Sequence, residues 1–262
     1  MEQMDMSRLV GRVVVVTGAA GGLGAAIAED LFQSGLKVAA FDCNLERVQA
    51  LAARLQGGSS SGAAGGSVHP LHVDITKEAE LKRAFQWVDE HLGAVAAIVN
   101  NAGIAPMSPL GDSDHQLMSS VLNTNVLGLA AATREAIESM KKHGVKDGVI
   151  VNIGSTVGHA EFISRALLDV FAMSMYATSK HAVIGFNRAL RAELRNQGVN
   201  VRVTDLSPGT VQTPLVSDKC LEDLEHRVLQ PRDIARAVRF VLSSPPSVEI
   251  VHLTIQPAGE VW

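Results

Sequence analysis

Two side chains spaced for proton transfer lie within MYATSKHAV, residues 175–183: the phenol of Tyr176 and the amine of Lys180. Tyr176 is the only tyrosine among 262 residues. Residues four apart share one face of a helix, so these side chains can meet. A free phenol, with a pKa near ~10, is a poor acid or base at neutral pH, but an adjacent ammonium stabilises the phenolate and lowers that pKa. Taken alone, however, the spacing favours an aromatic residue packed in a core beside a solvated lysine.

A serine hydroxyl follows the apolar run GVIVNIG, residues 148–154, at Ser155. Strands of a parallel sheet deliver ligand-binding residues at their carboxyl ends, so we expect Ser155 to face the same crevice as a bound nucleotide. There its hydroxyl would polarise a substrate carbonyl and stabilise the developing oxyanion. A cap or loop role is the alternative for an isolated serine.

A glycine-rich turn, TGAAGGLG at residues 17–24, follows the first β-branched run and leads into a helical pattern. Gly18, Gly22 and Gly24 would let the backbone approach a pyrophosphate, and the N–H groups at the start of the helix, near Leu23, would stabilise its charge. The same glycines also suit a tight strand-to-helix turn that binds nothing.

Two carboxylates follow the second and third β-branched runs. Asp42 can accept hydrogen bonds from both hydroxyls of an adenosine ribose and would repel a 2′-phosphate, which favours NAD over NADP. Its alternative role is to cap the helix that starts near Leu45. Asp74, in HVDIT, can reach the adenine or cap the helix that follows it, and the residues leave both roles open.

Short β-branched runs alternate with longer amphipathic stretches along the chain. The runs predict seven strands, at Arg12–Val16, Val38–Phe41, Val68–Val73, Ala97–Val99, Val149–Ile153, Val199–Asp205 and Ile250–Ile255. The stretches predict helices at Leu23–Ser34, Leu45–Leu55, Glu78–Leu92, His115–Lys142, Ala177–Asn196 and Pro231–Leu242. The alternation predicts one α/β domain over residues 1–262: a Rossmann fold with a doubly wound, seven-stranded parallel sheet and helices on both faces. The Gly/Ser segment at 57–67 is expected to be a flexible surface loop.

The composition, with 47% apolar and 19% charged residues, suits a soluble globular protein. A net charge of -4 without basic runs excludes a nucleic-acid or anionic-lipid binder, so we expect a small ligand. No segment is apolar and long enough for a signal peptide or a membrane span, which makes the cytoplasm the expected compartment. Cys43 and Cys220 are expected to be reduced thiols. His159 and His181 belong to no cluster of ligands visible in the sequence, so we expect no metal and assign both to packing or the surface.

The order of these motifs resembles the classical short-chain dehydrogenases/reductases from end to end. The matching segments are TGAAGGLG, DIT, NNAG at 100–103, NVLG at 125–128, the Ser155 region, YATSK and SPGTVQT at 207–213. The resemblance implies the catalytic residues Asn125, Ser155, Tyr176 and Lys180, with Asn125 holding a water that relays protons from the lysine. From the residues alone, Asn125 would be a polar side chain on a wet helix face.

The resemblance also implies a cofactor site. Its expected residues are Gly18, Gly22, Leu23, Gly24, Asp42, Asp74, Ile75, Asn101, Ala102, Gly103, Tyr176, Lys180, Pro208, Gly209, Val211 and Thr213. In the family, the SPGTVQT loop covers the nicotinamide, Thr213 contacts the carboxamide, and residues 214–227 would form a substrate lid. Ordinary turn chemistry explains this proline-glycine loop as well.

SxxGH at 155–159, YxxSKHAV at 176–183 and the C-terminal segment are most similar to insect farnesol dehydrogenase-like members and a vertebrate relative acting on steroids and carbonyls. Two features depart from those members: Asp42–Cys43 replaces an arginine suited to NADP, and the stretch from 158 to 175 is long. We interpret the apolar segment at 159–175 as the wall of a substrate pocket, with an oligomer contact or a shielding lid as the alternative.

These patterns together predict an NAD-dependent alcohol dehydrogenase acting on an apolar alcohol or carbonyl, such as an isoprenoid alcohol. A hydroxysteroid dehydrogenase or carbonyl reductase is the alternative within that class. A non-catalytic NAD-binding sensor is the alternative outside it. As in the family it resembles, the chain is expected to form a homodimer or homotetramer.

Overall fold

A single parallel sheet forms the centre of the protein in the computed structural model, which describes residues 5–57, 66–106, 108–159, 173–215 and 228–258. The seven strands lie in the order β3-β2-β1-β4-β5-β6-β7, and every neighbouring pair is parallel. Their bounds are β1 Val13–Thr17, β2 Lys37–Asp42, β3 Ser67–His72, β4 Val95–Asn100, β5 Gly148–Ile153, β6 Val201–Pro208 and β7 His252–Ile255. This architecture confirms the predicted Rossmann-type fold.

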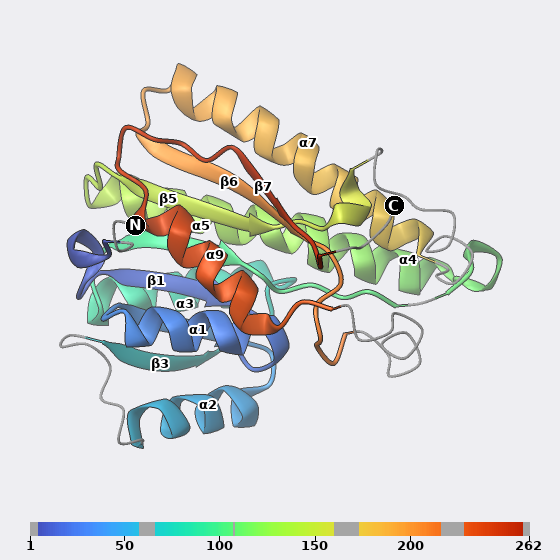
Figure 1. Ribbon diagram of the computed structural model, residues 1–262, viewed down its shortest axis with the longest axis horizontal. Helices are drawn as coiled ribbons and strands as arrows, with labels where there is room; N and C mark the ends of the chain where they lie inside the picture. The colour runs from blue at the N-terminus through green and yellow to red at the C-terminus, as the bar shows by residue number, and fades with distance from the viewer. Residues whose placement is uncertain (1–4, 58–65, 107, 160–172, 216–227, 259–262) are drawn as a thin grey trace.

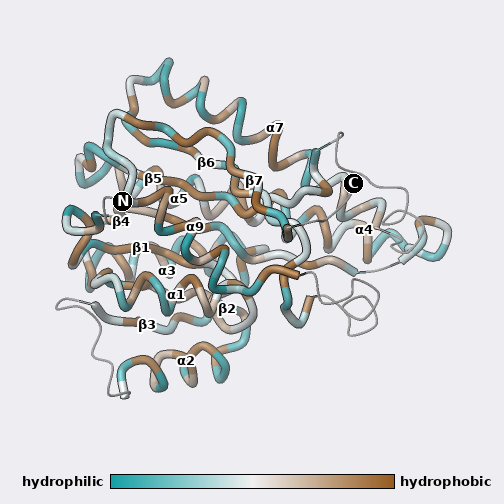
Figure 2. Tube along the Cα trace, viewed as in Figure 1, coloured by the Kyte–Doolittle hydropathy of each residue, from teal (hydrophilic) through white to brown (hydrophobic). Residues whose placement is uncertain are grey.

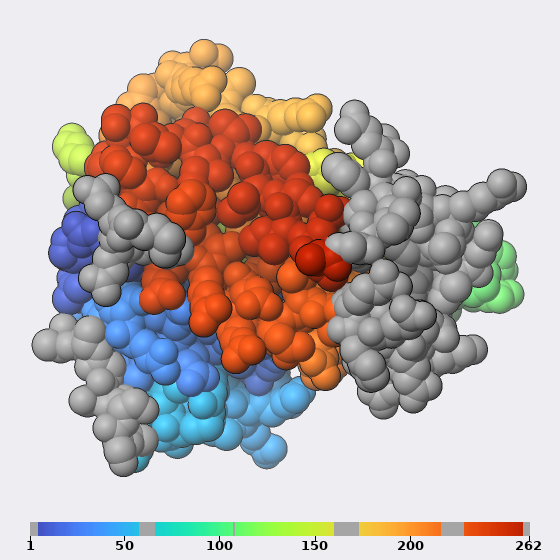
Figure 3. Space-filling model, in the orientation of Figure 1, coloured from blue at the N-terminus to red at the C-terminus, as the bar shows by residue number. Residues whose placement is uncertain are grey.

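Helices cover both faces of the sheet (Figure 1). One face carries α1 (Gly22–Gln33), α2 (Leu45–Gly57) and α9 (Pro231–Ser243), and the other carries α3 (Glu78–His91), α4 (His115–Leu122), α5 (Leu129–Lys142) and α7 (Ser174–Asn196). The space-filling view shows the atoms of α9 and of the C-terminal part of the chain at the front of the molecule, on the side of the first face (Figure 3).

Because both faces are covered, the central strands are apolar at successive positions rather than at alternate ones. In β1, Val14 and Val16 enter the core beneath α1 and α9, whereas Val13 and Val15 enter the core beneath α3 and α5. All four side chains are almost fully buried. The apolar strands are therefore bracketed by helices that turn their polar sides outward (Figure 2).

The main departure from the predicted elements lies in the long helix at 115–142. It is divided into α4 and α5 by a π-helical turn at Asn123–Gly128. Such turns are rare and often occur at functional sites. Here the turn contains Asn125, so the interruption places a predicted site residue where a regular helix would not.

The predicted Gly/Ser loop lies mostly outside the described residues. The Gly/Ser segment begins at the end of α2 and ends at the start of β3, and residues 58–65 between them are not described.

Among the helices that the structure describes, none combines the length and the apolar character needed to cross a membrane.

Candidate active site

The carboxyl ends of the strands open into a cleft with a volume of about 540 Å³, within the range of ligand sites. Most of the predicted cofactor and catalytic residues line it: Gly18, Gly22, Leu23, Asp42, Asp74, Ile75, Asn101, Ala102, Gly103, Ser155, Tyr176, Lys180, Pro208, Gly209, Val211 and Thr213. Gly24 and Asn125 are not among the lining residues, and each has a structural role described below.

The glycine turn has no room for a side chain at Gly18 or Gly24, because backbone atoms lie too close. Gly18 has a φ of +65° and Gly22 a φ of +52°, both in the left-handed region. A Cβ on Gly24 would lie 2.0 Å from the carbonyl oxygen of Gly18, so Gly24 contributes close packing rather than a cleft surface. Helix α1 begins here, and its N-cap, Gly21, has no side chain to bind the free N–H groups. These groups remain available to an anion.

Asn101 fixes the glycine turn to the end of β4. Its Nδ2 donates to the carbonyl oxygens of Thr17 and Gly18, both at 3.0 Å. The hydroxyl of Thr17 accepts from the backbone N–H groups of Asn101 and Ala102. The NNAG segment therefore holds two cleft walls together.

Asp42 lies at the end of β2, beside the glycine turn. Its two carboxylate oxygens accept the backbone N–H groups of Ala20 and Asn44, each at 2.8 Å. Asn44, not Asp42, caps α2, because the Oδ1 of Asn44 accepts the N–H of Arg47 at 3.0 Å. The helix-cap alternative for Asp42 is therefore wrong.

Asp74 has a local structural role as well as a place on the cleft. Its Oδ1 accepts both the N–H and the hydroxyl of Thr76, at 3.0 and 2.7 Å. Burial acts to raise the pKa of Asp74, but the bonds from Thr76 and the ammonium of Lys77 together lower it. The N-cap of α3 is Lys77, so Asp74 does not cap that helix directly.

Ser155 and Tyr176 meet through their hydroxyls. Ser155 follows β5 at the end of the sheet, and Tyr176 lies in the first turn of α7. Burial raises the pKa of Tyr176, while the hydrogen bond with the Ser155 side chain acts to lower it. The sequence predicted a pKa lowered by Lys180; that direction is wrong here, because desolvation outweighs the polar contacts.

Lys180 is buried beneath Tyr176, with 7% of its surface exposed. Its Nζ lies 5.5 Å from the centroid of the Tyr176 ring and donates to the carbonyl oxygen of Ile153 at 2.7 Å. Burial lowers the pKa of Lys180 to about 8, against the opposing attraction of Asp205. The two residues are thus neighbours on one helix face, as their spacing predicted.

Asn125 lies behind the cleft wall and is 2% exposed, so the wet-face interpretation is wrong. Its Oδ1 accepts the N–H of Ile104, and its Nδ2 donates to the carbonyl of Ile104, both at 2.9 Å. Nδ2 also donates to the hydroxyl of Ser179 at 3.0 Å. The π-helical turn thereby joins the chain after NNAG to α7.

The loop after β6 closes the other side of the cleft. The N–H of Gly209 donates to the carbonyl oxygen of Ile255 at 2.7 Å, and Val211 forms a β-bridge with Leu229. Thr213 lies against Gly22, since a Cβ there would be 3.3 Å from the Cβ of Thr213. Residues 216–227 of the predicted lid and 160–172 of the predicted insertion lie outside the described residues.

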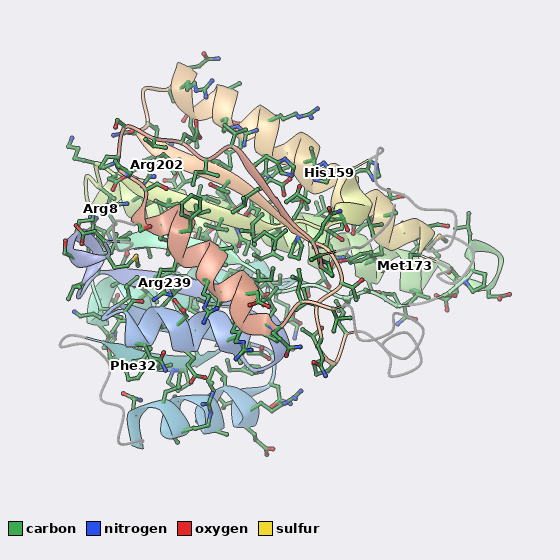
Figure 4. All side chains as sticks on the ribbon, viewed as in Figure 1. Arg8, Phe32, His159, Met173, Arg202 and Arg239 are labelled. Carbon is green, nitrogen blue, oxygen red and sulfur yellow. The ribbon has the colours of Figure 1, made fainter. Side chains whose placement is uncertain are left out.

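Arg47 and Met173 are among the cleft residues that sequence reasoning missed. Arg47, one turn into α2, lines the cleft, and a Cβ on Gly21 would lie 3.6 Å from the guanidinium. Met173, just before α7, lines it too and is labelled in Figure 4. Arg47 follows Asp42 by five residues, so the sequence signal for it was a cation close to the carboxylate of Asp42.

The structure brings together three residues that the sequence analysis did not connect: the ligand atoms of His159, Asp205 and His252 all lie within 4.8 Å of one another. Burial raises the pKa of Asp205 and lowers that of His159. The three residues are far apart in sequence, and only the pairing of β6 with β7 brings them together.

Comparison with known proteins gives a consistent picture. Residues 12–223 match the pattern of the short chain dehydrogenase family. A farnesol dehydrogenase of Aedes aegypti is 41% identical over 97% of this chain and 99% of its own length. Dehydrogenase/reductase SDR family member 11 of Homo sapiens is 34% identical over the full length of both chains.

Two solved structures resemble this fold closely. An alcohol dehydrogenase of Thermococcus sibiricus, complexed with 5-hydroxy-NADP, has a TM-score of 0.81 and 26% identity and covers 95% of this chain and 98% of its own. A 3-ketoacyl-(acyl-carrier-protein) reductase of Brucella melitensis, complexed with NADH, has a TM-score of 0.79 and 27% identity, over 94% and 97% of the two chains.

Proposed function

This chain belongs to the short chain dehydrogenase family, and from that premise we propose that it is an NAD-dependent dehydrogenase interconverting an apolar alcohol and its carbonyl compound. Members of the family are oxidoreductases that bind a nicotinamide dinucleotide. Bound in the cleft, that cofactor would supply the acceptor or donor of the hydride.

The observation that carries the proposal is the cluster of Ser155, Tyr176 and Lys180 in the same cleft as the uncapped glycine turn. A substrate oxygen beside the two hydroxyls would accept a hydrogen bond from Ser155 and exchange a proton with Tyr176. Lys180, beneath the ring, would supply positive charge when the phenol gives up its proton. Asn125 would keep α7 in register with the cofactor wall through its bonds to Ile104 and Ser179.

The fit of the chain to the cofactor rests on hydrogen-bond donors at one end of the cleft and an acceptor beside them. The free N–H groups at the start of α1 suit a pyrophosphate, and Asp42, at the end of β2, suits the hydroxyls of a ribose. The loop at 208–213 would cover the nicotinamide, and Asn101 and Asp74 lie along the wall between the two ends.

An apolar substrate is supported by the lining of the cleft. Ile104, Ala105, Val157, Met173 and Leu215 add apolar surface to the same cleft as the hydroxyl pair. Apolar walls with a few convergent polar groups suit a long hydrocarbon carrying one hydroxyl. The resemblance to a farnesol dehydrogenase points to an isoprenoid alcohol.

Initial rates on a panel of substrates test this function. We expect kcat/KM on farnesol to exceed that on ethanol or propan-2-ol by at least about a hundredfold, because each buried CH₂ contributes about 0.8 kcal/mol. Preference for steroids or ketones would instead indicate the hydroxysteroid dehydrogenase or carbonyl reductase. Tight cofactor binding without turnover on any substrate would indicate the non-catalytic sensor.

The preference for NAD is proposed from the carboxylate of Asp42, which would repel a 2′-phosphate. We expect the wild-type protein to favour NAD, and Asp42→Asn to raise kcat/KM for NADP relative to NAD by about tenfold or more, since it removes the negative charge. Initial rates at saturating alcohol give kcat/KM for NAD and for NADP in the wild-type protein and in the variant.

Arg47 supplies the control for this prediction. Its guanidinium lies beside Gly21 and would attract a 2′-phosphate, so Arg47→Ala is expected to weaken any use of NADP. If the wild-type protein preferred NADP and Arg47→Ala abolished that preference, the role assigned to Asp42 would be wrong. The cytoplasmic location and the homodimer or homotetramer stay predictions.

A further inference from the structure

A row of polar side chains crosses four neighbouring strands on the sheet face beneath α7. The strand register pairs Asn100 with Asn152, Asn152 with Asp205, and Asp205 with His252. Paired residues of parallel strands point to the same face, so these side chains form one line. Asn100 donates to Asn152 at 2.7 Å and Asn152 donates to Asn187 of α7 at 2.5 Å, which satisfies much of the inner half of the row.

The outer half of the row, Asp205 and His252, meets a third side chain from above the sheet. His159 follows the short helix at Thr156–Gly158 and lies between α7 and the edge strands (Figure 4). Its Nε2 lies 3.5 Å from the Oδ2 of Asp205, and the Nε2 of His252 lies 3.6 Å from the same oxygen. The centroids of the two imidazole rings are 4.4 Å apart, and the ring planes are inclined to each other by 33°.

These separations are longer than hydrogen bonds but suit ligands that share a metal ion. An ion with bonds of about 2.0–2.1 Å to nitrogen and oxygen in tetrahedral geometry holds its ligand atoms about 3.3–3.4 Å apart. Two imidazole nitrogens and one carboxylate oxygen are also a donor set found in zinc sites that keep a fourth position open. The three donors therefore need only small side-chain shifts to bind a cation.

We propose that His159, Asp205 and His252 form a binding site for a divalent transition-metal ion of the zinc class, with its fourth position open to water. Asp205 is 3% exposed, which gives a buried charge that a cation would compensate. His252, with 38% of its side chain exposed, provides the path by which the ion enters.

Other groups around the three residues set limits on the affinity. The hydroxyl of Ser207 lies 3.0 Å from the Nε2 of His159, and that of Thr254 lies 3.0 Å from the Nε2 of His252. Both hydroxyls would have to rotate away from these nitrogens when the ion binds; that of Ser207 already lies 3.2–3.3 Å from Asp205. The guanidiniums of Arg188 and Arg191 act on the cluster from α7 and disfavour a cation. We therefore expect reversible binding rather than a permanently loaded structural site.

The site also touches the catalytic segment. A Cβ on Gly154 would lie 2.4 Å from both the Oδ1 of Asp205 and the hydroxyl of Ser207, so the carboxylate is packed directly against the residue before Ser155. Asp205 also attracts the ammonium of Lys180. Binding of the ion is therefore followed by absorbance and stability rather than by dehydrogenase activity.

The proposal is tested by metal titration of the full-length protein. The protein is first treated with a chelator to remove bound metal and is then titrated with Co²⁺ or with Zn²⁺. We expect one equivalent of Co²⁺ to produce visible d–d absorption, which one equivalent of Zn²⁺ then removes. We also expect a rise in melting temperature with Zn²⁺, because an ion that binds only the folded chain stabilises it.

Variants locate the site. His252→Ala and Asp205→Asn are each expected to weaken binding by at least about tenfold, the loss typical even of a metal site's supporting residues. His115→Ala, an exposed histidine of α4, is the matched control and should leave binding unchanged. Circular dichroism confirms that each variant is folded.

Two results would overturn the proposal. One is the lack of saturable Co²⁺ or Zn²⁺ binding by the wild-type protein, which would make the cluster an ion pair of imidazoles and carboxylate. The other is binding that His252→Ala and the double variant His159→Ala/His252→Ala leave unchanged.

Discussion

Replacing Tyr176 by phenylalanine is expected to lower kcat by at least about a thousandfold, within the range that general acid–base catalysis contributes. The variant keeps the ring above Lys180 but loses the hydroxyl that meets Ser155, so the substrate oxygen has no proton donor or acceptor at that position. Binding of NAD should change little, because the glycine turn and Asp42 are untouched. Steady-state rates and calorimetric titration with NAD measure the two effects.

A neighbouring hydroxyl provides the control for this prediction. Thr178, two residues further along α7, is exposed and donates only to the carbonyl of Ser174. Thr178→Ala should therefore retain full activity. Substantial turnover by Tyr176→Phe, or an equal loss in both variants, would show that the phenol is not the proton-transfer group.

The state of this phenol has a consequence for the direction of the reaction. Because burial raises the pKa of Tyr176, the phenol is protonated at neutral pH in the structure described. It is then ready to donate a proton to a carbonyl oxygen, whereas oxidation of an alcohol first requires its deprotonation. The nearby ammonium of Lys180 and the hydroxyl of Ser155 are the groups that would stabilise the phenolate.

The fold could be predicted from sequence because its signals are local. Each strand is a short β-branched run and each helix an amphipathic stretch, so the alternation alone indicated a doubly wound parallel sheet. The glycine turn was equally readable, since Gly18, Gly22 and Gly24 sit where the chain must turn without side chains. These features depend on neighbours in the chain, not on distant contacts.

The features that the sequence did not reveal depend on distant contacts. Asn125 looked like a solvated helical residue, because nothing local indicates a π-helical turn or a partner such as Ile104. The pKa of Tyr176 was predicted in the wrong direction because desolvation depends on the whole surrounding protein. The cluster of Asp205 with two histidines needs the register of β6 and β7, which no local pattern specifies.

Replacing Lys180 by methionine is expected to abolish most activity and, at the same time, to stabilise the fold at neutral pH. The lysine is buried, and a pKa lowered from 10.5 to about 8 means that its charged form is disfavoured in the folded protein. The shift corresponds to about 3 kcal/mol in the free energy of unfolding at pH 7. Loss of the bond to Ile153 offsets about 1–2 kcal/mol of this, so we expect a net gain of about 1–2 kcal/mol.

The pH dependence of this gain identifies its cause. Below pH 8 the lysine is protonated in both the folded and the unfolded chain, and its penalty is fully present. Between pH 8 and 10.5 the unfolded chain binds more protons than the folded one, so the stability of the wild-type protein rises with pH relative to Lys180→Met. Denaturant unfolding at pH 7 and at pH 9.5 should therefore show the advantage of the variant shrinking as pH rises.

A variant of an exposed lysine controls for changes in stability that the titration of any surface lysine would cause. Lys146 is exposed on the turn before β5, so Lys146→Met should differ from the wild-type protein by the same small amount at both pH values. If Lys180→Met were less stable than the wild type at pH 7, with no change in the difference at pH 9.5, the ammonium of Lys180 would be as well stabilised in the folded protein as in the unfolded chain. A site built around a strained ammonium would then be excluded. A variant that is more stable at pH 7, with an advantage that shrinks at pH 9.5, would show that the charge beneath Tyr176 destabilises the folded protein.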